Sequence, residues 1–132
     1  MQLLLVRHAE AASGSPDELR PLTAEGRAQA RSLGERLRSE GVDPSAILTS
    51  PLLRARETGE LLAQELDAVT AVDERLAPGA TAERVAEAAA ERGGTVIAVA
   101  HQPDCSQIAA ALSGGDEPAF PPAAAMAISL SP

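Results

Sequence analysis

The chain has 132 residues, which suits a single domain with a modest core, and its one cysteine excludes an intrachain disulfide. Its net charge is −8 and its 11 basic residues are all arginine, so we expect no nucleic acid as partner, since a phosphate backbone needs a basic face. No apolar run reaches the roughly 20 residues of a membrane helix and no signal peptide is visible, so we expect a cytoplasmic protein without a membrane partner.

The run Leu3–Val6 predicts a strand covered on both faces, because its residues are continuously apolar. Thr23 is a suitable N-cap for a helix that extends to about Glu40, and Gly41 would end it. The inner face of that helix carries small and apolar residues at helical spacing: Ala30, Leu33 and Leu37.

The run Ile47–Thr49 predicts a second strand, followed by a helix with Ser50 as N-cap and Pro51 as its first residue. Its core-facing residues would be Leu52, Ala55, Leu62 and Leu66. This start places Arg54 in the first turn of the helix, whereas Arg56, two residues on, would point to solvent.

A third strand is expected over Val69–Val72 and a third helix over about Thr81–Arg92. The apolar run Thr95–Ala100 predicts a fourth strand, and a fourth helix would begin near Pro103. Residues at core spacing in that last helix are Cys105, Ile108, Ala109 and Leu112.

The final run, Ala125–Leu130, alternates, with Met126, Ile128 and Leu130 on one side, which is typical of a half-exposed edge strand and makes it a candidate antiparallel strand. The regular alternation of strands and helices predicts an α/β fold: a three-layer α/β/α sandwich around a mainly parallel sheet. We expect residues 1–132 to form one domain. Two loops, AASGSPDEL and GGDEPAFPP, lie where they could rim a site.

Arginines and histidines follow the predicted strands. In an open parallel sheet, ligands bind at the carboxyl ends of the strands. The first strand ends in Arg7 and His8, the fourth ends in His101, and the second leads into Arg54, so these side chains should meet at one edge of the sheet. Such a cluster, without a cysteine or lysine nucleophile, suggests phosphoryl transfer. Two imidazoles could instead bind a metal, but only carboxylates could complete its ligands, and we expect no metal or other cofactor.

Four segments together resemble the histidine phosphatase superfamily, which has a phosphoglycerate mutase-like fold: LLLVRHAEA, LRPLTAEGRAQA, ILTSPLLRARET and VIAVAHQP. The resemblance covers the chain from Met1 to about Leu130. The short chain and the RHAEA form resemble the SixA-type phosphohistidine phosphatase branch. Ala9 stands where the commoner motif has glycine, and its short side chain should fit. The resemblance implies a metal-independent phosphatase without a lid insertion, acting through a covalent phosphohistidine intermediate.

The resemblance also implies a role for each residue of the cluster. His8 is the nucleophile and must be neutral, a state that nearby arginines favour. Arg7, Arg54 and His101 surround the transferred phosphoryl group and hold the charge that develops on its oxygens. Arg20, in the loop after His8, is a further phosphate-binding residue, unless it is a solvated loop arginine.

A general acid is less clearly indicated. Many members of the superfamily use a carboxylate to protonate the leaving group, and Glu74, after the third strand, matches that position best. Glu10 is closer to His8 in sequence but could face elsewhere. A nitrogen leaving group needs less help than an alkoxide, so Glu74 could equally be an ordinary surface residue.

Three functions remain open. The segments between the motifs are too short for a lid, which favours a phosphorylated protein, such as a histidine-phosphotransfer domain, as partner and substrate. The second function is a phosphatase of small phosphoesters. The third is a non-catalytic phosphate-binding module, against which the full set of histidines and arginines argues.

Overall fold

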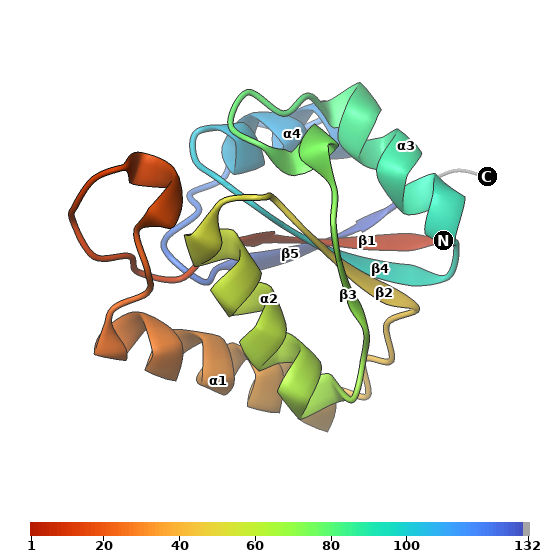
Figure 1. Cartoon of the computed structure of the whole chain (residues 1–132). Coiled ribbons are helices and arrows are strands. Elements are labelled where there is room, and N and C mark those ends of the chain that lie inside the picture. Colours follow the sequence, from red (N-terminus) through yellow and green to blue (C-terminus); the bar gives the residue numbers. More distant parts are fainter. Residues whose placement is uncertain (131–132) are drawn as a thin grey trace.

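A computed structural model of the chain describes residues 1–130, and it confirms the α/β class (Figure 1). Its strands are β1 (Gln2–Arg7), β2 (Ala46–Thr49), β3 (Thr70–Val72), β4 (Thr95–Ala100) and β5 (Ala125–Ser129). Its helices are α1 (Ala24–Ser39), α2 (Leu53–Leu66), α3 (Ala82–Arg92) and α4 (Asp104–Ser113), with short 3-10 turns η1 (Asp17–Leu19) and η2 (Glu74–Leu76).

The strands form one sheet in the order β3-β2-β4-β1-β5. The pairs β1·β4, β4·β2 and β2·β3 are parallel, and β5 runs antiparallel to β1, as its alternating pattern indicated. In this register Arg7 lies opposite Ala100, and Thr49 lies opposite Val99. Strands β1, β2 and β4 therefore end at nearly the same level, which brings the residues that follow them together.

Helices cover both faces of the sheet, with α1 and α2 on one side and α3 and α4 on the other (Figure 1). Strand β1 shows why both faces must be covered. Its residues Leu3 and Leu5 pack into the core on the α3–α4 side, and Leu4 and Val6 pack into the core on the α1–α2 side. A continuously apolar strand thus supplies two cores, and the three-layer prediction is confirmed.

The expected ends of α1 are confirmed. The side chain of Thr23 accepts a hydrogen bond from the backbone N–H of Gly26 at 2.9 Å, which satisfies one of the free donors of the first turn. At the other end Gly41 has a φ of +79°, a left-handed conformation that suits glycine and stops the helix.

The prediction that Ser50 caps a helix beginning at Pro51 is wrong. Helix α2 begins at Leu53, and Leu52 stands in the N-cap position with an extended ψ of 141°. The backbone N–H of Ser50 donates to the carbonyl of Val99 at 3.1 Å, so the chain is still paired with β4 at this residue. Strand β2 ends at Thr49 as expected, one further hydrogen bond at Ser50 joins the chain to β4, and Arg54 still falls in the first turn of α2.

The edge position of β5 is confirmed in detail. Ile128 is buried, and Met126 and Leu130 are partly buried against the core on the α3–α4 side. The alternating residues Ala127 and Ser129 are exposed.

Between α2 and β4 the described chain holds β3, η2 and α3. The assignment of residues 1–132 to a single domain without a lid stays a prediction. Within residues 1–130 no helix has the length and apolar character to cross a membrane.

Helix α1 lies so close to the strand-end loop that a methyl group at Gly26 would collide with the carbonyl oxygen of Glu10. We expect Gly26→Ala to lower the free energy of unfolding by about 1–3 kcal/mol, because the backbone around Glu10 would have to shift. Chemical denaturation monitored by circular dichroism measures this loss. Gly115→Ala is the control, since the nearest atom to its added carbon would be 3.9 Å away. Equal midpoints for both variants would contradict the close approach.

Candidate active site

The carboxyl ends of β1 and β4, the first turn of α2 and the loop containing η1 meet around one cavity. The cavity has a volume of about 430 Å³ and is open to solvent. Its lining residues are Arg7, His8, Glu10, Ala11, Asp17, Arg20, Arg54, Pro78, His101, Gln102 and Pro122. The cluster expected from the strand ends is therefore assembled, and the loops expected to rim it contribute Asp17 and Pro122.

The ring of His8 is oriented by its own chain. The backbone N–H of His8 donates to the carbonyl of Ala100 at 3.0 Å, which fixes the residue at the end of β4. Nδ1 of the ring lies 2.7 Å from the carbonyl oxygen of Ala9. A carbonyl oxygen only accepts, so Nδ1 carries the ring proton. In the neutral ring Nε2 then has a free lone pair, and within residues 1–130 the only side-chain hydrogen bond of His8 is the one made by Nδ1.

The environment of His8 favours the neutral ring. Burial, together with the positive charges of Arg54, Arg7 and Arg20, lowers the pKa of His8 to about 4, although the hydrogen bond to Ala9 acts in the opposite direction. At pH 7 the imidazole is therefore uncharged. An uncharged imidazole therefore lies among three guanidinium groups without itself being protonated.

His101 faces His8 across the cavity, with ring centroids 5.2 Å apart and ring planes inclined by 58°. Nε2 of His101 lies 2.7 Å from the hydroxyl oxygen of Ser50, and Nδ1 is buried without a hydrogen-bond partner in the described chain. Burial and the nearby His8 and Arg54 lower the pKa of His101 to about 3. Both imidazoles are thus neutral at physiological pH.

Two arginines add buried donors to the same cavity. Arg7 donates from one terminal nitrogen to the carbonyl of Phe120 at 3.0 Å, and Arg54 donates to the backbone and carboxylate oxygens of Asp17 at 2.9 and 3.2 Å. The Nε atoms of both guanidinium groups are buried and have no partner within residues 1–130. Unpaired buried donors cost stability, so their concentration around one cavity indicates a site for an anion.

Asp17 and Arg20 complete the rim on the side of η1. The Nε of Arg20 donates to Asp17 at 2.9 Å and its terminal nitrogen donates to the carbonyl of Ala12 at 3.1 Å, so Arg20 is a fixed part of the site and not a freely solvated loop residue. The hydrogen bond from Arg54 holds the pKa of the Asp17 carboxyl below its ordinary value. The sequence indicates this loop as a rim of the site but carries no pattern that distinguishes Asp17 within it.

Thr58 joins the loop that follows β1 to α2. Its hydroxyl accepts from the backbone N–H of Ala9 at 3.0 Å and donates to the carbonyl of Arg54 at 2.8 Å. The residue is fully buried. Thr58 stands one helical turn after Arg54, on the same face of α2, and this spacing is the signal that could have identified it.

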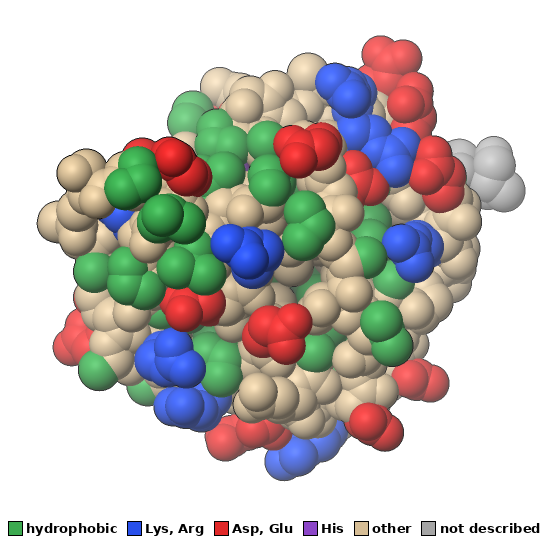
Figure 2. Space-filling view, in the orientation of Figure 1, with side chains coloured by type: hydrophobic (Ala, Val, Ile, Leu, Met, Phe, Trp, Pro, Cys, Tyr) green, Lys and Arg blue, Asp and Glu red, His purple; other side chains and the backbone are tan. Residues whose placement is uncertain are grey.

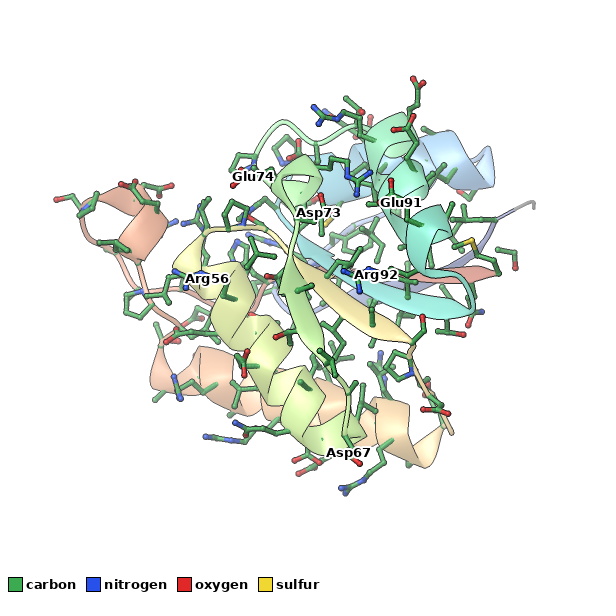
Figure 3. The ribbon with its side chains drawn as sticks, turned by 45° about the vertical axis from the view of Figure 1, so that its right-hand side comes forward. Arg56, Asp67, Asp73, Glu74, Glu91 and Arg92 are labelled. Carbon is green, nitrogen blue, oxygen red and sulfur yellow. The ribbon has the colours of Figure 1, made fainter. Side chains whose placement is uncertain are left out.

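The structure does not bring Glu74 into the cavity. Glu74, the first residue of η2, is exposed beside that turn (Figure 3). This turn is fixed by Arg75, which forms ion pairs with Asp73 and Glu91, both at 2.8 Å. Glu10 does line the cavity, with one carboxylate oxygen held by the hydroxyl of Thr23 at 2.9 Å. Catalysis by Glu74 stays a prediction, and Glu10 is the carboxylate nearer the site.

A second cavity, of about 240 Å³, lies between α2 and β3 on the face shown in Figure 2. Charged side chains of both signs are scattered over this face. Several polar groups lining the cavity are paired, as Arg27 is with Glu57 and Thr70 is with Glu60.

Among residues 1–130 no three histidine, cysteine, aspartate or glutamate side chains are grouped to hold a metal, and a metal-independent reaction stays a prediction.

Comparison with known sequences identifies relatives of this chain. Residues 3–79 match the model of the histidine phosphatase superfamily, branch 1. An uncharacterized protein of Picosynechococcus sp. is 37% identical over 123 residues, which covers 87% of this chain and 74% of the relative. The mitochondrial serine/threonine-protein phosphatase Pgam5 of Drosophila mojavensis is 38% identical over 66 residues, and that match covers 49% of this chain but only 23% of the relative.

Solved structures share the fold over nearly the whole chain. The protein histidine phosphatase SixA, in complex with tungstate, superposes with a TM-score of 0.90 at 28% identity, covering 98% of this chain and 88% of SixA. A mycobacterial glucosyl-3-phosphoglycerate phosphatase gives a TM-score of 0.74 at 23% identity, covering 97% of this chain and 90% of that enzyme. The second likeness is evidence of fold alone.

Both histidine rings should stay uncharged across the physiological pH range. We expect the ring resonances of His8 and His101 to titrate with midpoints near 4 and 3, not near the ordinary 6.5. The unfolded chain would take up these protons near 6.5, so the folded state should lose stability as the pH falls below 6.5. NMR titration measures the midpoints directly. A midpoint near 6.5 for either ring would contradict its buried, cation-flanked environment.

Proposed function

The chain belongs to the histidine phosphatase superfamily, and we propose that it is a phosphatase acting through a covalent phosphohistidine intermediate on His8. The observation that carries this proposal is the pinned tautomer of His8. Nδ1 of His8 donates its proton in a hydrogen bond to the carbonyl oxygen of Ala9, with 2.7 Å between the two atoms. The lone pair of Nε2 is then free in a cavity lined by arginines.

In the first step Nε2 of His8 attacks phosphorus, and the bond between phosphorus and the leaving group breaks. Nδ1 keeps its proton and its hydrogen bond to Ala9 throughout. The leaving group takes up a proton from solvent, which reaches the open cavity. In the second step water attacks phosphorus, the bond to Nε2 breaks, the proton of the water passes to solvent, and inorganic phosphate departs.

The arginines supply the stabilisation that this reaction needs. Charge on the equatorial oxygens of the transferring group is met by donors of Arg7 and Arg54, whose side chains line the cavity. Asp17 holds Arg54 in place before substrate arrives, so little reorganisation is required. His101 adds a neutral ring opposite the nucleophile.

We infer that the substrate is a phosphohistidine carried by a signalling or phosphotransfer protein. Two observations support this choice. The cavity is open, and the described chain between α2 and β4 holds only β3, η2 and α3, which leaves room for a folded partner to approach. The SixA structure, a protein histidine phosphatase, matches 98% of the chain. A nitrogen leaving group also suits a cavity into which Glu74 does not reach.

A small phosphoester is the second candidate substrate. The cavity volume of about 430 Å³ lies within the range of roughly 300–1,000 Å³ that is usual for small-ligand sites. A panel that contains a phosphohistidine protein, phosphoserine and phosphothreonine peptides, and several sugar phosphates separates the candidates. A higher kcat/KM on one sugar phosphate than on the phosphohistidine protein would overturn the first choice.

The covalent intermediate can be trapped. After brief reaction with a labelled phosphohistidine protein and a rapid quench, we expect acid-labile, alkali-stable label on His8, in the presence of a metal chelator. His8→Ala should carry no label and release phosphate only at the background rate, because the nucleophile is gone. Phosphate release by His8→Ala at the wild-type rate would rule out this mechanism, and loss of labelling with the chelator would rule out metal independence.

Removal of one buried guanidinium should slow the reaction. We expect Arg54→Ala to reduce kcat by about 100- to 1,000-fold, because a donor aimed at the transition state is lost. Arg56→Ala is the matched control, since Arg56 is an exposed residue of the same helix and does not line the active-site cavity (Figure 3). Steady-state kinetics on the phosphohistidine protein measures both. Similar rates for the two variants would show that Arg54 does not act on the transition state.

A further inference from the structure

We propose that Ser50 is a positioning residue that fixes the tautomer of His101, so that Nδ1 of that ring carries the proton and donates it in a hydrogen bond to the phosphoryl group. This inference rests on the proposed function for the identity of the bound group. The assignment of the tautomer itself depends only on the hydrogen bonds of Ser50, which can be tested without any substrate.

The contact between the two side chains is short and sheltered. The Ser50 oxygen lies 2.7 Å from Nε2 of His101, and Ser50 has no exposed surface. The backbone of Ser50 is held against β4 by its N–H···O bond to Val99 at 3.1 Å. The pairing of Ser50 with β4 therefore positions its hydroxyl against the ring of His101.

The hydrogen bonds of Ser50 decide which atom donates. Its oxygen accepts the backbone N–H of Leu52 at 3.2 Å, so one lone pair is used. The hydroxyl also has one proton, and within the described chain Nε2 of His101 is the acceptor available to it. If Nε2 carried a proton instead, the buried hydroxyl proton would be left without an acceptor, which is unfavourable for a buried polar group. Ser50 therefore donates, and Nε2 accepts.

The tautomer determines what His101 offers the substrate. Burial and neighbouring charges keep the ring neutral, so it has one proton only. With Nε2 accepting from Ser50, that proton is on Nδ1, the buried atom that has no partner within residues 1–130. In the opposite tautomer Nδ1 would present a lone pair to a phosphoryl oxygen and repel it. Ser50 thus makes a neutral histidine into a donor.

The first test is carried out on the unmodified protein. The chain has two histidines, so long-range ¹⁵N–¹H correlations of the rings can be assigned completely. At pH 7 we expect both rings to carry the proton on Nδ1. Inorganic phosphate should then shift the Nδ1 resonance of His101. A proton on Nε2 of His101, or an Nδ1 resonance that saturating phosphate does not move, would overturn the proposal.

The second test removes the hydroxyl. In Ser50→Ala we expect the proton of His101 to move wholly or partly to Nε2, while His8 keeps its proton on Nδ1 and serves as an internal reference. The kcat should fall about 10- to 100-fold, somewhat less than when a donor is deleted outright. Ser50→Thr, which retains the hydroxyl, should restore the Nδ1 proton. An unchanged tautomer in Ser50→Ala would refute the role of Ser50.

A matched control comes from the other end of β4. The hydroxyl of Ser45 donates to the carbonyl of Gly93 at 2.7 Å, far along the strand from His101. Ser45→Ala should leave both tautomers and the kcat as in the unmodified protein. A protein with the expected tautomers that forms no phosphoenzyme would remove the proposed phosphatase function but would support the role of Ser50 in fixing His101.

Discussion

The hydrogen bond from Nδ1 of His8 to the carbonyl of Ala9 is the contact on which the site depends. It fixes one ring proton and so fixes where the lone pair is. Binding of phosphate needs positively charged side chains, whereas an imidazole that is to act as a nucleophile must stay unprotonated. The two needs are compatible here because burial and the same guanidinium groups that would bind phosphate lower the pKa of His8 to about 4.

This arrangement costs stability, and the fold offsets the cost elsewhere. Three buried side-chain nitrogens within residues 1–130 lack partners, on Arg7, Arg54 and His101, and all belong to residues that line the same cavity. Such groups destabilise a folded chain. Cores on both faces of the sheet, and strands that end at one level, hold these residues in place despite that cost. The site is therefore a property of the whole sheet and not of one loop.

Sequence patterns predicted the layers, the antiparallel edge and the meeting of His8, His101 and the arginines, because parallel strands deliver the residues at their carboxyl ends to one edge. The roles of Ser50 and Asp17 could not be predicted in this way. The local sequence predicts Ser50 as a helix cap, because the hydrogen bond from its backbone to Val99 joins segments that are distant in sequence. The positions of Asp17 and Glu10 at the cavity depend on how the loop after β1 folds, and no periodic sequence pattern predicts that fold.

An oxyanion complex tests the central claim most directly. Vanadate resembles a phosphoryl group in transfer, and a crystal structure of the protein with vanadate would locate the reacting atom. The account predicts vanadium bonded to, or in line with, Nε2 of His8, with its oxygens contacting Arg7, Arg54 and Nδ1 of His101. Vanadate bound outside this cavity, or against Nδ1 of His8, would contradict it.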